Sequence, residues 1–467
     1  MSEEKLKDGG TGKMSEKKKA KQTMDLLHGP LWNKILLFAI PIAASSILQQ
    51  LFNSADVAVV GRFAGRQALA AVGSNQAAIN LLINLFVGLS VGANVMIARY
   101  IGENKAEKIH TAVHTAIMVA LVSGIFLIGF GFFMSRFMLE LMDTPEDVIE
   151  LATLYLRIYF AGMPFMMVYN FGAAILRSRG DTRRPLICLV VSGAVNVVLN
   201  LFFVIVCGMS VAGVGIATVI ANVISSCMVV CFLMHEEGEL RLYLKKLRVD
   251  KKVLADMAKI GIPAGIQGMV FSLSNVCIQT ALNRFGSVAV AGSAAALNFE
   301  FFVYFLMNSF TQAAVTFVSQ NFGAGNYERC RRIVIMCIAA GAVSSGLLSA
   351  VFVIGGEWFL RIYTTDAEAV RYGLIRMRHI LTFQFINAVM DVTAGVLRGV
   401  GYSVIPAVIT IAGVCGLRVL WVQTIFPRTG TFEMLVNVYP VTWLVTAVLM
   451  VVVYVGISKK VFRVTNE

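Results

Sequence analysis

Residues Leu176–Pro185 (LRSRGDTRRP) and Leu397–Pro406 (LRGVGYSVIP) match each other at a shift of 221 positions. Leucine, arginine, glycine and proline coincide in the two segments. A second pair, Ala39–Ser46 (AIPIAASS) and Gly261–Gly268 (GIPAGIQG), matches at a shift of 222 and aligns its prolines. Several matches at nearly one shift indicate that the chain consists of two related halves.

Each half is made of long apolar runs. Of the 467 residues, 57% are apolar and 14% charged, whereas soluble domains are about 45–50% apolar and about 25% charged. A transmembrane helix needs roughly 20 apolar residues. The runs indicate twelve spans, at 34–58, 76–99, 111–136, 150–176, 186–207, 211–234, 254–281, 293–320, 333–358, 373–397, 404–426 and 436–458. We therefore predict an all-α polytopic membrane protein with twelve transmembrane helices in two pseudo-symmetric six-helix bundles.

The basic residues indicate how the chain is oriented. With both termini in the cytoplasm, 29 of the 40 Lys and Arg residues lie on the inner side, ten lie outside and Arg418 lies within a span. This asymmetry follows the positive-inside rule, so the net charge of +13 reflects topology and not nucleic-acid binding. We expect a multi-pass protein of the cell membrane with these parts: a disordered basic cytoplasmic tail (1–30), an N-terminal bundle (31–234), a cytoplasmic linker (235–253) and a C-terminal bundle (254–467).

Because each half has an even number of spans, both enter the membrane from the same side. This arrangement is a parallel repeat, known among transporters. It predicts a cleft between two bundles that can rock against each other.

Polar residues in the N-terminal half recur at helical spacing. In the first span Ser45, Gln49, Asn53 and Asp56 share one face. An ionisable group at bilayer depth normally faces a wet interior, so Asp56 predicts a polar pocket. The candidate ligands of a proton or cation are Asp56, Asn170, Asn196, Asn200 and Thr218, with Gln49 and Asn53 as candidate substrate contacts. The alternative is that the amides and hydroxyls join neighbouring helices by hydrogen bonds.

The C-terminal half carries a comparable set with different charge. Asp391 coincides with Asn170 at the shift of 221, and Glu300 lies in the eighth span. The candidate substrate contacts here are Gln267, Glu300, Gln384, Asn387 and Asp391. Alternatively, Arg418 neutralises one of the two acids as a structural ion pair. We expect Arg177 and Arg398, at matched helix ends, to reach the headgroups or to hold the inner loops.

No motif indicates bond-cleaving chemistry. The sequence contains no HExxH motif, no Cys/His cluster and no paired spacing among its eight cysteines. Gly9–Met14 (GGTGKM) lacks the first glycine and the Ser/Thr of a phosphate loop. We therefore expect neither an enzyme nor a cofactor.

The chain resembles the multidrug and toxic compound extrusion (MATE) family of cation-coupled exporters. The resemblance rests on the six-plus-six spans, on Leu26–Ser45 (LLHGPLWNKILLFAIPIAAS), on LFNSADVAVVGRFAG around Asp56, on the repeated LRxxG…P, on NVVLN (Asn196–Asn200) and on GVGIAT (Gly213–Thr218). It covers nearly all of residues 26–460. It implies two bundles in an outward-facing V that antiport H⁺ or Na⁺ against organic, often cationic, compounds by alternating access.

The resemblance also suggests roles for individual residues. Asp56 matches the aspartate of the N-lobe cation site, and Asn196 and Thr218 match its polar partners. Asn200 stands where many members have aspartate, and Asn387 stands where the Na⁺-linked branch has one. These departures favour H⁺ over Na⁺, with a Na⁺ site near Asp56 as the less favoured reading. The expected substrates are small organic cations or amphipathic drugs, handled by a monomer in the lipid bilayer.

Two other functions remain as alternatives. A flippase for a lipid-linked precursor, as in related two-lobed families, is expected to have a strongly basic cavity, whereas Arg418 is nearly alone at depth. A channel would show unsaturable flux and fits poorly with tandem halves. The major facilitator signature is absent after the second span, where Arg99–Ile109 (RYIGENKAEKI) stands.

Overall fold

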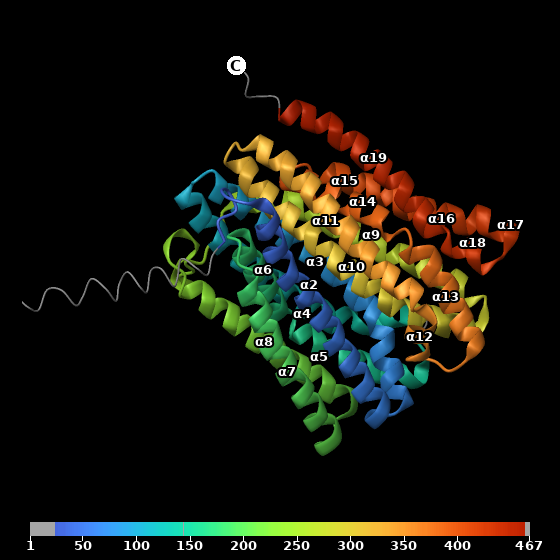
Figure 1. Cartoon of the computed structure of the whole chain (residues 1–467). Coiled ribbons are helices and arrows are strands. Elements are labelled where there is room, and N and C mark those ends of the chain that lie inside the picture. Colours follow the sequence, from blue (N-terminus) through green and yellow to red (C-terminus); the bar gives the residue numbers. More distant parts are fainter. Residues whose placement is uncertain (1–23, 143, 463–467) are drawn as a thin grey trace, which may run out of the picture.

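The computed structural model describes residues 24–142 and 144–462, and every regular element in them is helical (Figure 1). The N-terminal half contains α2 (Leu31–Val59) with the π-helical turn η1 (Val60–Ala64), α3 (Arg66–Gly102), α4 (Ala106–Leu141), α5 (Glu146–Ala161), α6 (Met163–Ser178), α7 (Arg183–Leu201) with η2 (Phe202–Val206), and α8 (Ser210–Met234). The linker contains the short 3₁₀ turns η3 (Gly238–Leu240) and η4 (Leu244–Lys246).

The C-terminal half repeats this series. It contains α9 (Lys251–Asn283), α10 (Gly286–Gly323), α11 (Tyr327–Ile354), α12 (Gly356–Arg361), α13 (Ala367–Leu381), α14 (Gln384–Gly399), α15 (Val404–Thr410), η5 (Ile411–Gly416), α16 (Leu417–Leu420), η6 (Trp421–Ile425), α17 (Phe426–Thr429), α18 (Phe432–Val436) and α19 (Val438–Val461). Within the described residues, ten helices are long and apolar enough to cross a membrane, or twelve if each of two bent pairs is one span. The predicted all-α architecture of twelve spans is confirmed.

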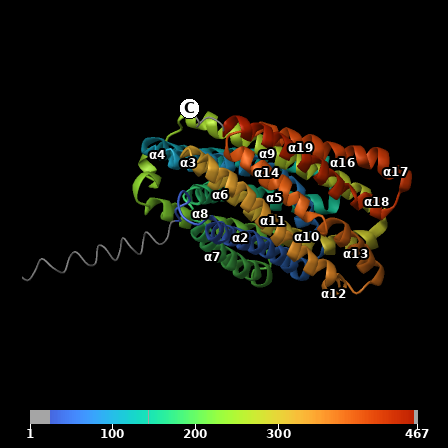
Figure 2. The same cartoon turned by 45° about the horizontal axis from the view of Figure 1, so that its top comes forward.

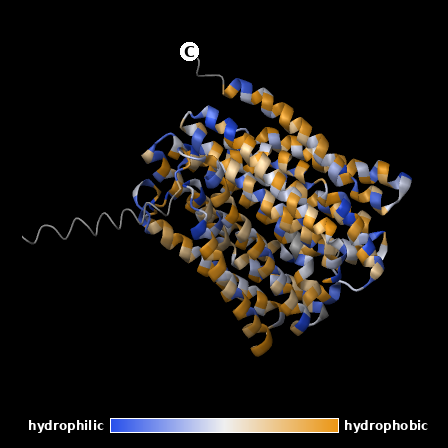
Figure 3. Cartoon of the chain, viewed as in Figure 1, coloured by the Kyte–Doolittle hydropathy of each residue, from blue (hydrophilic) through white to orange (hydrophobic). Residues whose placement is uncertain are grey.

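The two halves agree element by element. The pairs α5–α6 and α13–α14 are each bent by 46°, and both begin and end 221 residues apart in the sequence. Helices α7 and α15 also start in the same way. Each has a proline in its first turn and a π-helical stretch further on. Helices are the expected elements because backbone polar groups have no water to bind in the hydrocarbon core. Hydrophobic residues predominate along most of these helices (Figure 3).

Both described ends of the chain lie at one end of the bundle, which we call the terminal end (Figures 1 and 2). The amide of Asn321, at the close of α10, donates to the carbonyl of Leu26 over 3.1 Å. The ring of Phe462 lies 6.4 Å from that of Phe322. The even number of crossings in each half explains this placement.

The halves meet through α2, α3, α9 and α10. Near the terminal end, Phe38 of α2 packs edge-on against Phe317 of α10 at 5.4 Å. Thr316 of α10 donates to Asn94 of α3 over 3.0 Å. Nearer the middle of α3, Asn84 donates to Ser272 of α9 over 3.0 Å. The contact between the halves therefore extends from the middle of α3 to the terminal end.

Glycines allow α3 and α9 to cross closely. A Cβ atom at Gly88 would lie 2.3 Å from the backbone nitrogen of Gly265, and one at Gly92 would lie 2.3 Å from a backbone oxygen of α9. Gly88 and Gly92 are four residues apart, as are Gly261 and Gly265. This spacing is the small-residue motif that lets membrane helices approach at backbone distance.

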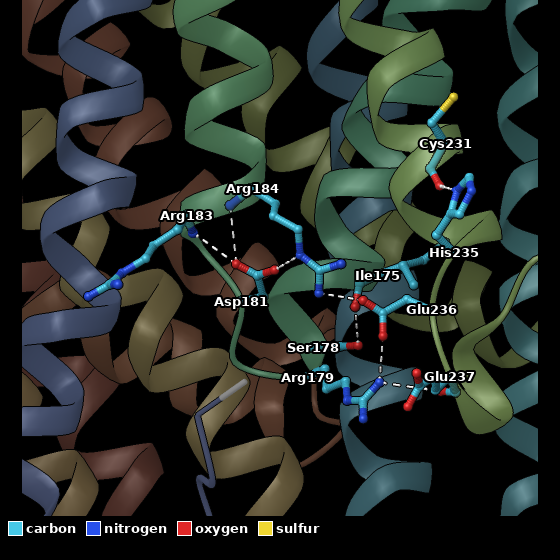
Figure 4. Close-up of polar contacts among 10 residues, drawn as sticks. All are labelled: Ile175, Ser178, Arg179, Asp181, Arg183, Arg184, Cys231, His235, Glu236 and Glu237. Atoms are coloured by element: carbon cyan, nitrogen blue, oxygen red, sulfur yellow. Dashed lines mark hydrogen bonds and ion pairs between the residues drawn. The ribbon is translucent and has the colours of Figure 1, made fainter. Parts of the chain in front are cut away.

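The linker is fixed to the N-terminal half by charged groups (Figure 4). Glu236, which is 7% exposed, accepts from Arg179 over 2.6 Å and forms a second ion pair with Arg184. Asp181 pairs with Arg184 and accepts from the backbone nitrogens of Arg183 and Arg184 at 3.0 and 3.1 Å. The cluster joins the α6–α7 loop to the start of the linker. The linker ends at residue 250, three residues before the predicted 253, because α9 begins at Lys251.

The expected disorder of residues 1–30 does not extend to the segment before α2. Residues 1–23 lie outside the described residues, but Leu26 is 1% exposed and Lys34 donates to the carbonyls of Asp25 and His28. Partial burial alone would raise the pKa of Asp25. The backbone N–H groups of Leu27 and His28, the His28 side chain and Lys34 outweigh burial and lower this pKa below its ordinary value.

Candidate functional site

A chain of polar side chains crosses three helices of the N-terminal half. Asp56, near the end of α2, accepts a hydrogen bond from the amide of Asn200 on α7. The same amide lies 3.3 Å from the Asn196 side-chain oxygen, and Asn196 donates to Thr218 of α8 over 3.4 Å. Thr218 donates to the carbonyl of Val214 over 2.9 Å. Four of the five predicted proton or cation ligands therefore lie together.

The spacing of the two asparagines explains how this chain forms. Residues four apart on a helix lie on the same face, so Asn200 can contact α2 while Asn196, on the same face of α7, contacts α8. Asn196 is 5% exposed and Asn200 is fully buried, while Asp56 is half-buried. Buried amides need partners, and the carboxylate of Asp56 accepts from one of them.

Two tyrosines lie around this carboxylate. The charge of Asp56 acts on both Tyr155 and Tyr159 of α5. Their rings lie 6.1 Å apart. Among the described residues, Asp56 forms no ion pair with Lys, Arg or His. Asp56 is thus a carboxylate without a cationic partner in a polar, partly enclosed setting.

The remaining predicted residues of this half lie apart from the chain. Asn170 of α6 is half-buried and makes no hydrogen bond to Asp56 or its partners within the described residues. Gln49 and Asn53 of α2 are exposed. They share the helix face of Asp56 but lie nearer the middle of α2. The structure leaves them free to meet a ligand without placing them in the hydrogen-bonded chain.

One acceptor next to Asp56 has no donor among the described residues. This acceptor is the side-chain oxygen of Asn200, which is buried. Among the described residues there is no group of three or more His, Cys, Asp or Glu side chains that could hold a metal ion.

The corresponding region of the C-terminal half is centred on α14. Asp391 is half-buried there, and the charged group that acts on it is Arg398. Arg398 donates to the side-chain oxygen of Gln267 on α9 over 2.6 Å. Arg398 therefore turns into the bundle, which corrects the expectation that it reaches the headgroups or holds an inner loop. Asn387 and Gln384, on the same helix, are buried.

Glu300 is bound by an arginine inside the predicted tenth span that the sequence analysis did not single out. Arg376 of α13 donates to both carboxylate oxygens of Glu300, over 2.6 and 2.9 Å, and to Ser293 over 2.9 Å. Glu300 is 8% and Arg376 5% exposed. The expectation that Arg418 neutralises an acid is wrong for Glu300, because Arg418 instead donates to Asn275 over 3.0 Å.

A sequence signal for Arg376 existed. It lies three residues after Gly373 and four residues before Ile380, and Gly373 lies four residues after Ala369. All three of these neighbouring positions are buried. Arg376 therefore lies on the apolar face of an amphipathic helix, where a buried partner is required. The sequence analysis did not use this periodicity, and it therefore missed Arg376.

The comparisons with known proteins agree with this architecture. The sequence profile of the MatE family matches residues 41–202 and 263–422, one segment in each half. The probable multidrug resistance protein YoeA of Bacillus subtilis is 27% identical over 83% of this chain and 86% of its own length. YpnP of the same organism, also described as a probable multidrug resistance protein, is 26% identical over 81% of this chain and 84% of its own.

A solved structure has the same fold. It is a multidrug resistance MATE family transporter of the MOP superfamily in an outward-facing conformation, with a TM-score of 0.86 at 20% identity, covering 93% of this chain and 98% of that one. The family profile matches well over half of the sequence, in the two repeated halves that the structure shows. The chain therefore belongs to the MatE family and is a multi-pass membrane transporter, not an enzyme.

Proposed function

We propose that this transporter exports organic, often cationic, compounds across the cell membrane in exchange for H⁺, with Asp56 as the coupling carboxylate. The observation that carries the proposal is the hydrogen-bonded chain from Asp56 through Asn200 and Asn196 to Thr218. The relatives YoeA and YpnP are described as probable multidrug resistance proteins, which supports drug-like substrates.

The proposed cycle uses the charge state of Asp56. When ionised, the carboxylate accepts from Asn200 and favours a conformer that holds a cationic compound. Protonation from outside removes the charge and the reason for that hydrogen bond, so α2 can repack and release the compound. Coupling requires the proton to bind the two conformers with different affinity.

The driving force depends on the net charge that crosses the membrane. One charge moved through 100 mV supplies about 2.3 kcal/mol, which corresponds to a concentration ratio of roughly 50 for a compound without net charge. A monovalent cation exchanged for one H⁺ moves no net charge, so the pH gradient alone drives its export. The proposed substrate contacts are Gln49 and Asn53 in the N-terminal half and Gln267, Gln384, Asn387 and Asp391 in the C-terminal half. We further propose that the terminal end faces the cytoplasm and that the protein works as a monomer.

The test uses purified protein in liposomes, with uptake of a fluorescent organic cation measured under separately imposed H⁺ and Na⁺ gradients. We expect the H⁺ gradient to drive transport and Asp56→Asn to abolish it at normal expression. Asp147→Asn is the matched control, because Asp147 is an exposed carboxylate at the start of α5. Wild-type transport driven by Na⁺ alone, or normal H⁺-driven transport by Asp56→Asn, would refute the assignment.

A further inference from the structure

Arg418 is a buried cation that the proposed cycle does not use. It lies on α16, between the π-helical stretches η5 and η6, and is 0% exposed. The short helix α16 packs against α9 and α19. The guanidinium carbon lies 5.1 Å from the ring centre of Phe271 and 4.5 Å from that of Tyr439.

One edge of this guanidinium has no partner. Nη1 donates to Asn275 over 3.0 Å, whereas Nε and Nη2 are buried and have no acceptor among the described residues. The adjacent Arg376 uses the same two nitrogens, Nε and Nη2, to bind both oxygens of Glu300. The open edge of Arg418 therefore has the donor pair that a carboxylate fits in bidentate fashion.

The charges around Arg418 do not balance. Arg376 lies 5.4 Å from the ring centre of Tyr439, so two guanidinium groups share this ring. The carboxylate of Glu300 is already bound by Arg376, and the charge that acts on Asp391 is that of Arg398. Among the described residues of the C-terminal half, Arg418 is therefore left without a carboxylate partner.

A further donor lies next to the same ring. The indole nitrogen of Trp443 is buried and has no acceptor among the described residues, and its ring lies 5.9 Å from that of Tyr439 in an edge-on arrangement. Cation–π contacts contribute about 2 kcal/mol when they are desolvated. They do not fully compensate the desolvation cost of burying an ion, which is several kcal/mol. A negatively charged acceptor would remove the imbalance.

We propose that Arg418 binds the carboxylate group of a compound that the transporter carries, with Nε and Nη2 donating to its two oxygens. Asn275, which is exposed on α9 and accepts from Nη1, is where the compound approaches the guanidinium. The inference extends the proposed function to zwitterionic substrates: the C-terminal half binds the acid group and the N-terminal half controls coupling.

The test is a titration of purified transporter in detergent with sodium benzoate, with sodium chloride as a second arm and sodium fluoride keeping the ionic strength constant. The readouts are the melting temperature and tryptophan fluorescence. We expect saturable stabilisation by benzoate and fluorescence quenching that Trp443→Phe reduces. No gradient is used, so failure here would leave the role of Asp56 untouched.

Two substitutions separate charge from shape. Arg418→Met should weaken benzoate binding at least tenfold, and Arg418→Lys should weaken it nearly as much, because an ammonium keeps the charge but lacks the planar donor pair. Arg371→Met is the control, since Arg371 is exposed on α13. Unsaturable benzoate binding by the wild type, equal binding by Arg418→Met, or binding of chloride alone would overturn the proposal. If neither Arg418 variant folds, the wild-type titration and Trp443→Phe decide.

Discussion

Breaking the ion pair between Glu300 and Arg376 tests whether this acid serves the fold or the substrate. The pair is bidentate and both side chains are buried. Removing one partner leaves the other charge desolvated, which typically costs about 3–5 kcal/mol. We therefore expect Glu300→Gln and Arg376→Met each to lower the melting temperature in detergent by roughly 5–10 °C.

The double variant should behave differently. With Glu300→Gln and Arg376→Met combined, no buried charge is left unpaired, and such neutral replacements are often close to neutral in stability. The bond from Arg376 to Ser293 is lost in any case, so a small deficit of about 1 kcal/mol is expected. The coupling energy between the two sites, which is the sum of the two single losses minus the loss in the double variant, should then be roughly 5–9 kcal/mol.

Melting temperature and transport together decide the question. A double variant that is stable and still transports shows that the pair stabilises the fold. A double variant as unstable as either single one would refute the reasoning about the unpaired charge. A stable double variant that has lost transport would instead assign Glu300 to the substrate, as the sequence analysis predicts.

Three further predictions concern other parts of the molecule. Gly88→Ala should cost about 1–3 kcal/mol through overpacking at the α3–α9 crossing and lower the melting temperature, whereas Gly73→Ala, with nothing within 4 Å, should not. Glu236→Gln should speed tryptic cleavage of the linker roughly tenfold, because charge-assisted hydrogen bonds contribute about 1.5–3 kcal/mol. Glu239 is exposed, so the control variant Glu239→Gln should be cleaved at the wild-type rate. The pKa of Asp25 is lowered in the folded protein, so its ionised carboxylate stabilises the fold. This stabilisation is full above the ordinary carboxyl pKa of about 3.9 and is lost as the pH falls through the lowered value. Pepsin cleavage beside Asp25 should accelerate over that window, and Asp25→Asn should abolish the pH dependence.

Most of the architecture could be predicted from the sequence. The number of spans follows from apolar run length, and the two-fold repeat follows from the matched segments, which the equal bends of 46° confirm. The helices are longer than the predicted spans because helix ends continue beyond the apolar core, as in α3 and α10. Hydrophobicity alone cannot mark those ends.

The candidate site was predictable only in part. Helical spacing places Asn196 and Asn200 on one face of α7, and the structure adds that this face meets Asp56. The close crossing of α3 and α9 rests on glycine pairs that the sequence contains, but the spacing does not name the partner helix. The same limit applies to Asn170, which lies outside the hydrogen-bonded chain.

The sequence by itself determined the helices and the repeat, because apolar length and local periodicity are properties of a single segment. The tertiary structure alone decided the charge pairing: Arg376 binds Glu300, Arg398 turns toward Gln267, and Arg418 keeps an unpaired edge. The reason is that an ion pair depends on which helices pack together and at what height. That choice is made by contacts between segments far apart in the chain.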